Sequence, residues 1–312
     1  MIPRYLNLTK SEIEEKTKGL FGLLRCCKLC PRECGVNRLE GETGFCLTGR
    51  YAYVSSYNLH FGEEDPLVGT GGSGTIFFAG CNLGCVFCQN YEISHSTEGS
   101  HEVTKEQLAQ MMIILQDQGA HNINFVSPTH IIPQIVEALG IAIEMGLKIP
   151  LVYNTGSYDK VEVLKILDGI IDIYLPDTKF FDPDLCEKYL KAKDYSERAK
   201  AAIKEMHRQV GDLQINDAGI AEKGLLVRHL LMPNGLAGTE KWMEFIAKEI
   251  SLNTYINIMD QYRPCGEATK YKELVGVVSY EELKRAQDIA LKFGLKRLDK
   301  RDFSRFVYLF RK

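Results

Sequence analysis

The feature that most constrains the fold is an alternation of short β-rich runs with helical patterns after residue 74. The runs are rich in β-branched and aromatic residues, and the segments between them repeat apolar residues at helical spacing. The six runs are 75–80, 122–126, 150–153, 170–175, 225–231 and 254–259. Strands that alternate with helices pair in parallel through right-handed crossovers. The pattern therefore predicts an α/β fold whose six strands form an open, partial barrel.

Capping residues mark where helices begin between these runs. Thr104 with Gln107, and Ser279 with Glu282, match the capping-box pattern, in which paired side chains satisfy backbone N–H groups at a helix start. The connection 181–223 is long enough for two helices. The chain therefore has the helices that parallel pairing of strands requires.

Composition excludes several classes of protein. Of the 312 residues, 45% are apolar and 25% are charged, as is typical of a folded domain that buries its own core. The net charge of −3 gives no overall attraction to nucleic acid or to a membrane surface. No apolar run reaches the ~18 residues of a membrane span, and the first residues lack a signal-peptide core. We expect a cytoplasmic protein without membrane or nucleic-acid partners.

The cysteines are strongly clustered. Of the ten, eight lie between Cys26 and Cys88. Cytoplasmic thiols stay reduced, so a cluster of this kind indicates metal ligands more than disulfides. Cys81, Cys85 and Cys88 form a C-x3-C-x2-C pattern directly after the first strand run.

Polar residues gather near the ends of the other five strand runs. They are the segments SPTH (127–130), YNTGSYD (153–159) and PDTKF (176–180), the pair Arg228 and His229, and the segment NIMDQY (257–262). Ligands of such barrels bind where the carboxyl ends of the strands meet. The three-cysteine loop and these polar segments are therefore expected to surround one site.

Three thiolates suit one kind of metal centre better than others. A structural zinc site needs four ligands, usually as two separated pairs. A four-iron cluster held by three thiolates keeps one iron open for another ligand. The isolated triad Cys81, Cys85 and Cys88 therefore favours an iron–sulfur cluster with an open position.

Together these features resemble the radical S-adenosylmethionine (radical SAM) superfamily. The resemblance rests on C-x3-C-x2-C with Phe87 before the last cysteine, placed after the first strand of a (β/α)6 pattern, and it covers about residues 70–265. It implies a [4Fe–4S] cluster on Cys81, Cys85 and Cys88. It also implies that S-adenosylmethionine binds the open iron and is cleaved to a 5′-deoxyadenosyl radical, which abstracts hydrogen from a substrate.

Within the superfamily, the chain is similar to relatives of pyruvate formate-lyase-activating enzyme. The similar segments are 30–46, 72–94, 152–159, 174–180 and 257–264. This similarity implies a radical oxidoreductase that acts on a protein or peptide, such as an enzyme that forms a glycyl radical. It also implies an electron donor such as flavodoxin or ferredoxin.

The resemblance assigns roles to residues of the later strands. Phe87 would pack near the adenine, and Lys179, in an Asp-x-Lys pattern with Asp177, would neutralise the methionyl carboxylate. Arg228 would be a second cation for that carboxylate or for the ribose. Asn257, together with Asp260, would bind ribose or substrate.

The chain departs from the family pattern after the second strand. Many members carry Gly-Gly-Glu there, which contacts the methionyl amine, whereas this chain has VSPTH (126–130). Ser127, Thr129 or His130 would have to take over part of that contact.

The N-terminal cysteines form a second group. Cys27, Cys30, Cys34 and Cys46 have the spacing C-x2-C-x3-C-x11-C, with Cys26 as an alternative first ligand. Four thiolates can hold a zinc ion or a second [4Fe–4S] cluster, and the spacing does not decide between them. Reduced thiols in a small core are the alternative without a metal.

These patterns divide the chain into three parts. We expect a Cys-rich N-terminal extension over 1–70, the partial barrel over 71–265, and a C-terminal extension over 266–312 packed on the barrel. Two other functions remain open. One is a radical SAM enzyme that acts on a small molecule or a nucleoside, and the other is a non-enzymatic electron-transfer protein.

Several other groups have two interpretations. His60, Glu63 and Glu64 are either acid–base groups or part of a polar loop. Cys265 is a candidate ligand or radical relay, and Cys186 is expected to be buried on a helix. His229 is interpreted as a hydrogen-bonded core histidine, because only one of two neighbouring strand residues faces the barrel interior. The basic and aromatic tail 299–312 is expected to pack on the barrel.

Overall fold

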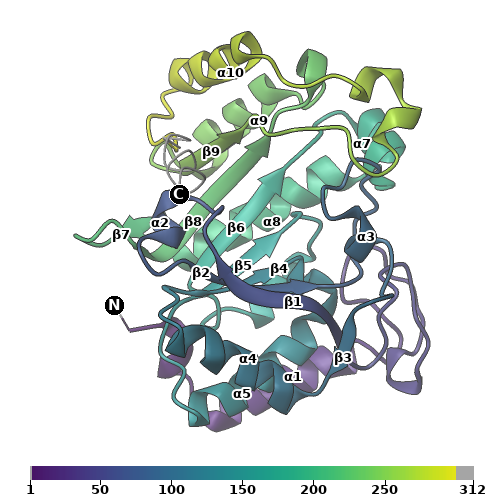
Figure 1. Ribbon diagram of the computed structural model, residues 1–312, viewed down its shortest axis with the longest axis vertical. Coiled ribbons are helices and arrows are strands. Elements are labelled where there is room, and N and C mark those ends of the chain that lie inside the picture. The colour runs from purple at the N-terminus through teal and green to yellow at the C-terminus, as the bar shows by residue number, and fades with distance from the viewer. Residues whose placement is uncertain (1, 300–312) are drawn as a thin grey trace, which may run out of the picture.

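The computed structural model describes residues 2–299 of the chain, and the tail 300–312 lies outside this part. Within residues 2–299, nine strands form one sheet in the order β3-β1-β2-β4-β5-β6-β8-β7, with β9 paired to β8 (Figure 1). The strands are β1 (Ala52–His60), β2 (Ser73–Phe78), β3 (His101–Val103), β4 (Ile123–Val126), β5 (Leu151–Thr155), β6 (Ile173–Thr178), β7 (Gln214–Ile215), β8 (Ala221–Leu230) and β9 (Tyr255–Met259).

The parallel part of the sheet matches the six predicted strands. In the described chain, β2, β4, β5, β6, β8 and β9 pair side by side in parallel. Strands β2 and β9, at the two ends of this series, do not pair with each other within residues 2–299, so the barrel is open. The expected α/β partial barrel is therefore confirmed.

Helices connect the strands and cover the sheet. They are α1 (Lys10–Gly22), α2 (Asp65–Val68), α3 (Tyr91–Ser94), α4 (Lys105–Asp117), α5 (Ile132–Glu144), α6 (Val161–Ile166), α7 (Pro183–Leu190), α8 (Tyr195–Val210), α9 (Thr239–Phe245) and α10 (Tyr280–Lys292). Thr104 and Ser279 cap α4 and α10 through complete capping boxes. Helices α7 and α8 occupy the connection expected to hold two helices.

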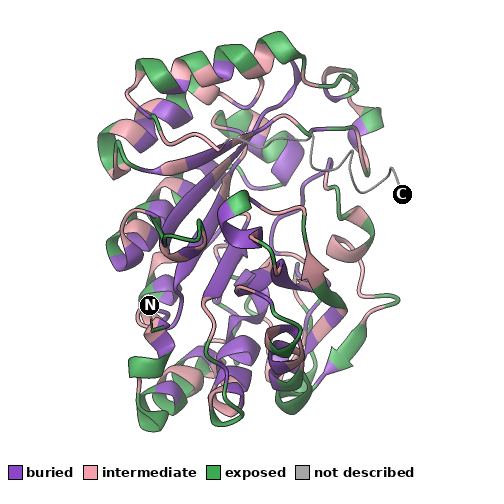
Figure 2. Cartoon of the chain, turned by 60° about the vertical axis from the view of Figure 1, so that its left-hand side comes forward, coloured by how far each residue is buried: buried purple, intermediate pink, exposed green. Residues whose placement is uncertain are grey.

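Buried residues concentrate in the strands, and the outer faces of the helices are exposed (Figure 2). Every residue of β5 is buried, as expected for a central parallel strand. On one side of the sheet, α1 packs against α5, and α5 packs against α4 (Figure 1). The start of the chain is attached to the barrel because the N–H of Arg4 donates to Asp172 Oδ1 at 2.6 Å.

Strand β1 was not predicted. It lies within 1–70, the segment expected to form the Cys-rich N-terminal extension, and it pairs antiparallel with β2, with Tyr57 opposite Ile76. Only Ala52 and Val54 of β1 are buried, whereas residues 56–58 are exposed. A strand this polar has too little apolar alternation to be recognised from sequence. It nevertheless brings the chain back to the barrel, ahead of residues 60–64.

Candidate functional site

A cavity of about 380 Å³ opens at the carboxyl ends of the parallel strands. Its walls come from the loop after β2 and from residues at or just beyond the ends of β4, β5, β6, β8 and β9. The lining residues include Cys81, Cys85, Phe87, Cys88, Ser127, Asn154, Asp177, Lys179 and Arg228. The cysteine loop and all five polar strand ends therefore surround one space. The fifth segment contributes Gln261 and Tyr262.

Contacts with neighbouring elements hold the cysteine loop in place. The N–H groups of Gly84 and Val86 donate to the carbonyl oxygens of Leu190 and Tyr189, at 3.2 and 2.9 Å. These bonds attach the loop to the end of α7. The hydroxyl of Ser94 lies 3.3 Å from the sulfur of Cys88.

The three thiols have the character of iron ligands. Burial raises the pKa of the Cys81 thiol to about 11, and burial also raises the pKa of Cys85. A buried thiolate needs a positive charge beside it, and iron would supply that charge. All three thiols line one cavity, so these residues fit a [4Fe–4S] cluster held by three thiolates.

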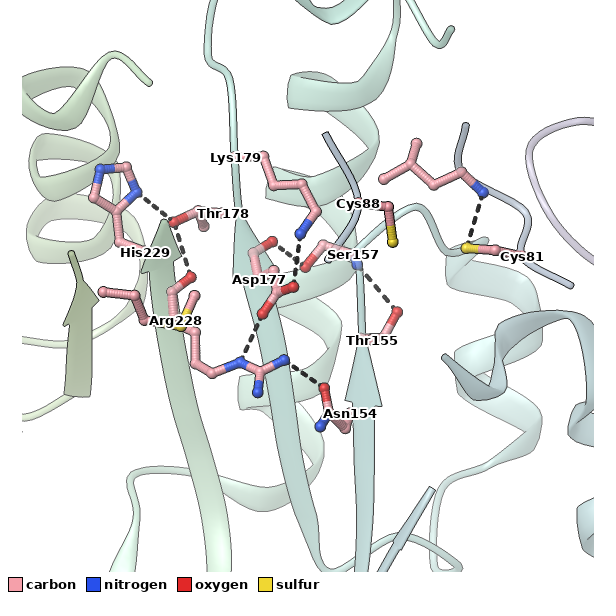
Figure 3. Close-up of polar contacts among 12 residues, drawn as sticks. Cys81, Cys88, Asn154, Thr155, Ser157, Asp177, Thr178, Lys179, Arg228 and His229 are labelled. Carbon is pink, nitrogen blue, oxygen red and sulfur yellow. Dashed lines mark hydrogen bonds and ion pairs between the residues drawn. The ribbon is translucent and has the colours of Figure 1, made fainter. Parts of the chain in front are cut away.

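Asp177, which also lines this cavity, lies between two cations, Lys179 and Arg228 (Figure 3). Its two carboxylate oxygens accept hydrogen bonds from Lys179 Nζ and from Arg228 Nε, each at 2.7 Å. Arg228 also donates to Asn154 Oδ1 at 2.5 Å. The parallel pairing of β6 with β8 sets Asp177 directly opposite Arg228.

The charges of this group stabilise one another. Burial by itself would raise the pKa of Asp177, but the neighbouring Arg228 and Lys179 outweigh burial and hold that pKa below its usual range. Burial alone would lower the pKa of Lys179, whereas the Asp177 carboxylate raises it. At neutral pH the group is therefore one carboxylate between two cations, and Arg228 Nη1 has a second carboxylate oxygen, Glu63 Oε2, at 3.5 Å.

Arg228 and His229 point to opposite sides of β8, as the alternation along a strand requires. Arg228 lines the cavity. His229 is fully buried between the hydroxyls of Thr178 and Thr239, each 2.9 Å from a ring nitrogen. Burial lowers the pKa of His229 to about 4, so it is a neutral core histidine, as interpreted from the sequence.

The three residues considered for the amine contact follow β4, and they differ in whether they line the cavity. Ser127 lines the cavity with a left-handed backbone at φ 56°, and its N–H donates to Asn154 O at 2.8 Å. Thr129 is buried and donates to Asp159 Oδ1 at 2.8 Å. His130 is buried, with Nε2 3.0 Å from Ala79 O. Only Ser127 of the three lines the cavity within the described chain.

Phe87 lies in the wall of the cavity. It is buried and makes edge-to-face contacts with Phe180 and Tyr262, with ring centroids 5.6 and 6.1 Å apart. These contacts fix the orientation of the ring. Phe87 is therefore a rigid apolar wall beside the cysteines.

Asn257 and Asp260 do not line the cavity in the part of the chain that the structure describes. The side-chain amide of Asn257 donates to Glu64 Oε1 at 2.6 Å. Gln261, one residue beyond Asp260, lines the cavity. Asn257 therefore reaches the site through Glu64.

Sequence reasoning placed His60, Glu63 and Glu64 in the N-terminal extension, but all three line the cavity. His60 Nδ1 lies 3.2 Å from Glu63 Oε1, and Glu63 Oε2 lies 3.5 Å from Arg228 Nη1. The segment reaches the cavity because β1 runs antiparallel beside β2. The run of three acids after Gly62 was the only signal in the sequence.

Four cysteines of the N-terminal group line a second, smaller cavity. They are Cys27, Cys30, Cys34 and Cys46, and they share it with Arg38, Asn82 and His130 among others. Cys26 is exposed and does not line this cavity. The structure therefore places Cys27, and not Cys26, beside the other three.

Cys186 and Cys265 line neither of the two cavities. Cys186 is buried on α7, with its sulfur 3.3 Å from Phe180 O, and Cys265 is half-buried in the loop after β9. Within residues 2–299, no three His, Cys, Asp or Glu side chains are arranged to hold a single metal ion. No helix of the described chain is long and apolar enough to cross a membrane.

Comparison with known proteins gives matches at the level of sequence. The model of the radical SAM superfamily matches residues 75–216. The uncharacterized protein MJ0674 of Methanocaldococcus jannaschii is 36% identical over 290 residues, which cover 90% of this chain and 78% of that protein. The uncharacterized protein MJ0808 of the same organism is 28% identical over 157 residues, or 45% of this chain and 46% of that protein.

Comparison with solved structures gives two matches. HydG, a maturase of the [FeFe]-hydrogenase, has a TM-score of 0.51 and 13% identity, covering 97% of this chain and 66% of that chain. A domain of pyruvate-formate lyase-activating enzyme from Bacteroides vulgatus has a TM-score of 0.36 and 13% identity, covering 63% of this chain and 91% of that chain.

Proposed function

This chain belongs to the radical SAM superfamily, and from that membership we propose that Cys81, Cys85 and Cys88 hold three irons of a [4Fe–4S] cluster whose fourth iron binds S-adenosylmethionine. When bound, these groups supply a 5′-deoxyadenosyl radical that takes a hydrogen atom from a substrate. The observation that carries the proposal is that the three thiols and the Asp177–Lys179–Arg228 group line one cavity.

Lys179 is the residue proposed to bind the methionyl carboxylate. Its side chain is only 12% exposed, and its ammonium group keeps its charge because Asp177 pairs with it. A charge-assisted hydrogen bond from a buried donor is stronger than one in water. Asp177 is a positioning residue, because it holds both Lys179 and Arg228 at the wall of the cavity.

Apolar side chains complete the binding site. Phe87, Leu230 and Met259 line the cavity. These groups exclude water, which would otherwise weaken the charge interactions. We propose that Phe87 packs against the adenine, that Arg228 contacts the carboxylate or ribose, and that Ser127 contacts the amine. Asn257 would act on ribose or substrate through Glu64.

The substrate is proposed in two forms. Similarity of the segments around 174–180 and 257–264 to activating enzymes supports hydrogen abstraction from a glycine of a protein partner. A small polar substrate is the alternative, because the cavity combines apolar side chains with polar groups from several strand ends. An electron donor of the flavodoxin or ferredoxin type would reduce the cluster, in a reducing compartment such as the cytoplasm.

Cleavage of S-adenosylmethionine tests the proposed function. Protein reconstituted without oxygen and reduced with dithionite should form methionine and 5′-deoxyadenosine in equal amounts. Each of Cys81→Ala, Cys85→Ala and Cys88→Ala should abolish cleavage, while Cys186→Ala, which changes a buried cysteine outside the cavity, should retain it. Cleavage that persists in Cys81→Ala would refute the ligand assignment.

The same assay can separate the two substrate forms. With a deuterated candidate substrate, deuterium should appear in 5′-deoxyadenosine only when the true substrate is present. A glycyl radical that forms on an added protein would support the activating role. Transfer from a small molecule without any protein partner would exclude that role.

A further inference from the structure

The second cavity, lined by the N-terminal cysteines, has the composition of a second cluster site. We propose that Cys27, Cys30, Cys34 and Cys46 bind an iron–sulfur cluster that passes electrons to the cluster on loop 81–88. This electron transfer, called the relay below, rests on the proposed function of the first cavity. The presence of the second cluster does not depend on that function.

The local backbone brings the four thiols together. The N–H of Cys27 donates to Val36 O at 2.9 Å, and the N–H of Gly35 donates to Cys27 O at 3.1 Å. This pairing sets Cys27 beside Gly35 and Val36, which directly follow Cys34. The N–H of Phe45 lies 3.5 Å from the sulfur of Cys34, which links the distant Cys46 segment to the first three cysteines. Four thiols around one cavity are the full ligand set of a [4Fe–4S] cluster.

A buried cation beside the thiols indicates that the cavity receives an anionic group. Arg38 is 1% exposed and lines the cavity. In the described structure, its guanidinium donates to Gly49 O at 3.1 and 3.0 Å and to His130 O at 2.8 Å, and it has no carboxylate partner. A buried charge without a counter-charge is costly. Four thiolates around a metal cluster would supply the missing negative charge.

The position of the second cavity favours a redox cluster over zinc. Asn82, in the cysteine loop of the first cavity, lines both cavities. Arg32 of the N-terminal segment donates to Asn82 O at 2.9 Å. A Cβ added to Gly80 would lie 2.2 Å from the carbonyl oxygen of Cys46, so the two cysteine segments are in direct contact. Zinc has no redox chemistry, and it would gain nothing from this contact.

One of the four proposed ligands is exposed, so an external electron donor can approach the second cluster. Cys27, Cys30 and Cys46 are buried, whereas Cys34 is exposed. One electron from an external low-potential donor, such as dithionite or a reduced ferredoxin, would convert the second cluster from [4Fe–4S]²⁺ to [4Fe–4S]⁺. Transfer of that electron returns it to the 2+ state and reduces the first cluster by one electron.

The test separates the two clusters by mutation. A variant with Cys81→Ala, Cys85→Ala and Cys88→Ala is purified without oxygen, and its iron, sulfide and zinc are counted. We expect about half of the wild-type iron and sulfide, because only one of two clusters is lost. After reduction, its electron paramagnetic resonance (EPR) spectrum should show a cluster signal that S-adenosylmethionine does not change. Zinc in place of iron, or neither metal, would overturn the second cluster.

A milder pair of variants covers the case in which the triple variant does not fold. Cys34→Ser should reduce the iron content or shift the signal that is insensitive to S-adenosylmethionine. Cys26→Ser is the matched control, because Cys26 is also exposed but does not line the cavity, and it should leave both unchanged. Equal effects of the two substitutions would overturn the ligand assignment.

The relay has its own readout. Ferredoxin should reduce the first cluster more slowly in Cys34→Ser than in Cys26→Ser. The rate is measured from the EPR signal that responds to S-adenosylmethionine. Equal rates would exclude the relay and leave the second cluster as a separate result. If the wild type does not cleave S-adenosylmethionine, the proposed function fails, yet the metal count of the triple variant still decides whether the second cluster exists.

Discussion

At the scale of single residues, the site depends on charges that are buried and paired. Removing a carboxylate and two cations from water is expensive, and the cost is recovered only when each has a partner in good geometry. Asp177 meets this condition through two 2.7 Å contacts with Lys179 and Arg228. Arg228 has a second carboxylate, Glu63, at 3.5 Å, whereas Asp177 is the only acidic partner of Lys179 within residues 2–299. Lys179 is therefore the cation better placed to receive a further anion.

Lys179→Met should weaken the binding of S-adenosylmethionine while leaving the cluster in place. Methionine keeps the length of the side chain, and Arg228 still pairs with Asp177. The loss of one hydrogen bond to a charged group, about 1.5–3 kcal/mol, corresponds to a roughly 10- to 100-fold rise in the dissociation constant. Equilibrium dialysis without oxygen measures it, with the exposed Lys148→Met as control. Unchanged affinity would contradict the assigned role.

His229 should make the protein less stable as the pH falls. Its pKa is about 4 in the folded protein, whereas an unfolded histidine has a pKa of ~6.5. Below pH ~6.5 the unfolded chain takes up a proton that the folded protein does not, so stability falls by up to about 1.4 kcal/mol per pH unit until about pH 4. The melting temperature of His229→Gln should therefore depend less on pH between 6.5 and 5. The exposed His101→Gln should behave like the wild type, and an unchanged slope in His229→Gln would contradict the argument.

At the scale of elements, the cysteine loop and the N-terminal segment depend on one glycine. Gly80 has φ 76°, and an added Cβ would meet the carbonyl oxygen of Cys46 at 2.2 Å. A backbone atom cannot move aside as a flexible side chain would. The contact between the two cysteine segments therefore requires glycine at this position.

Gly80→Ala should lower the melting temperature and the iron content together. Gly99→Ala is the matched control, because Gly99 has a similar φ of 75° but nothing within 4 Å of the added Cβ. The control should pay only for the left-handed backbone, about 1–2 kcal/mol, and should keep its iron. The two variants are compared by thermal melting and by iron analysis. Equal behaviour would show that the close contact with Cys46 has no consequence.

The sequence predicted those elements whose signal is local. The six parallel strands are runs of apolar residues, and the capping boxes at Thr104 and Ser279 are short patterns, so both could be recognised. Strand β1 could not be recognised, because the exposed residues in its middle show no alternation of apolar and polar side chains. For the same reason Glu63 and Glu64 could not be placed at the site. Their position depends on the pairing of β1 with β2, which is a contact between segments and not a property of either one.

Site residues were predictable to the extent that their strands were. Asp177, Lys179 and Arg228 follow from the rule that the carboxyl ends of parallel strands meet. Asn257 was assigned to ligand binding, but its side chain bonds to Glu64, which the sequence could not place nearby. The contact between Cys46 and Gly80 was also out of reach, because it depends on how the N-terminal segment packs on the barrel.

At the scale of the whole molecule, the division into 1–70, 71–265 and 266–312 remains a proposal about sequence segments. The structure adds that β1 and β3 belong to the same sheet as the barrel strands. The N-terminal segment is also tied to the barrel through hydrogen bonds of Arg32 to Asn82 O and Leu190 O, at 2.9 and 3.3 Å. Shared pairing of this kind couples the stability of segments.

The N-terminal part and the barrel should therefore unfold together. Thermal melting followed by far-ultraviolet circular dichroism and by the visible absorption of the iron–sulfur chromophore should give one coincident transition. Two separate transitions in the circular dichroism signal itself would contradict this coupling.

The central claim is that one iron of the cluster on Cys81, Cys85 and Cys88 has no protein ligand and binds S-adenosylmethionine. EPR spectra of the reduced protein, recorded with and without S-adenosylmethionine, test it most directly. The account predicts that the signal lost in Cys81→Ala is also the signal that changes when S-adenosylmethionine is added. A cluster signal that depends on Cys81 but is identical with and without S-adenosylmethionine would contradict it.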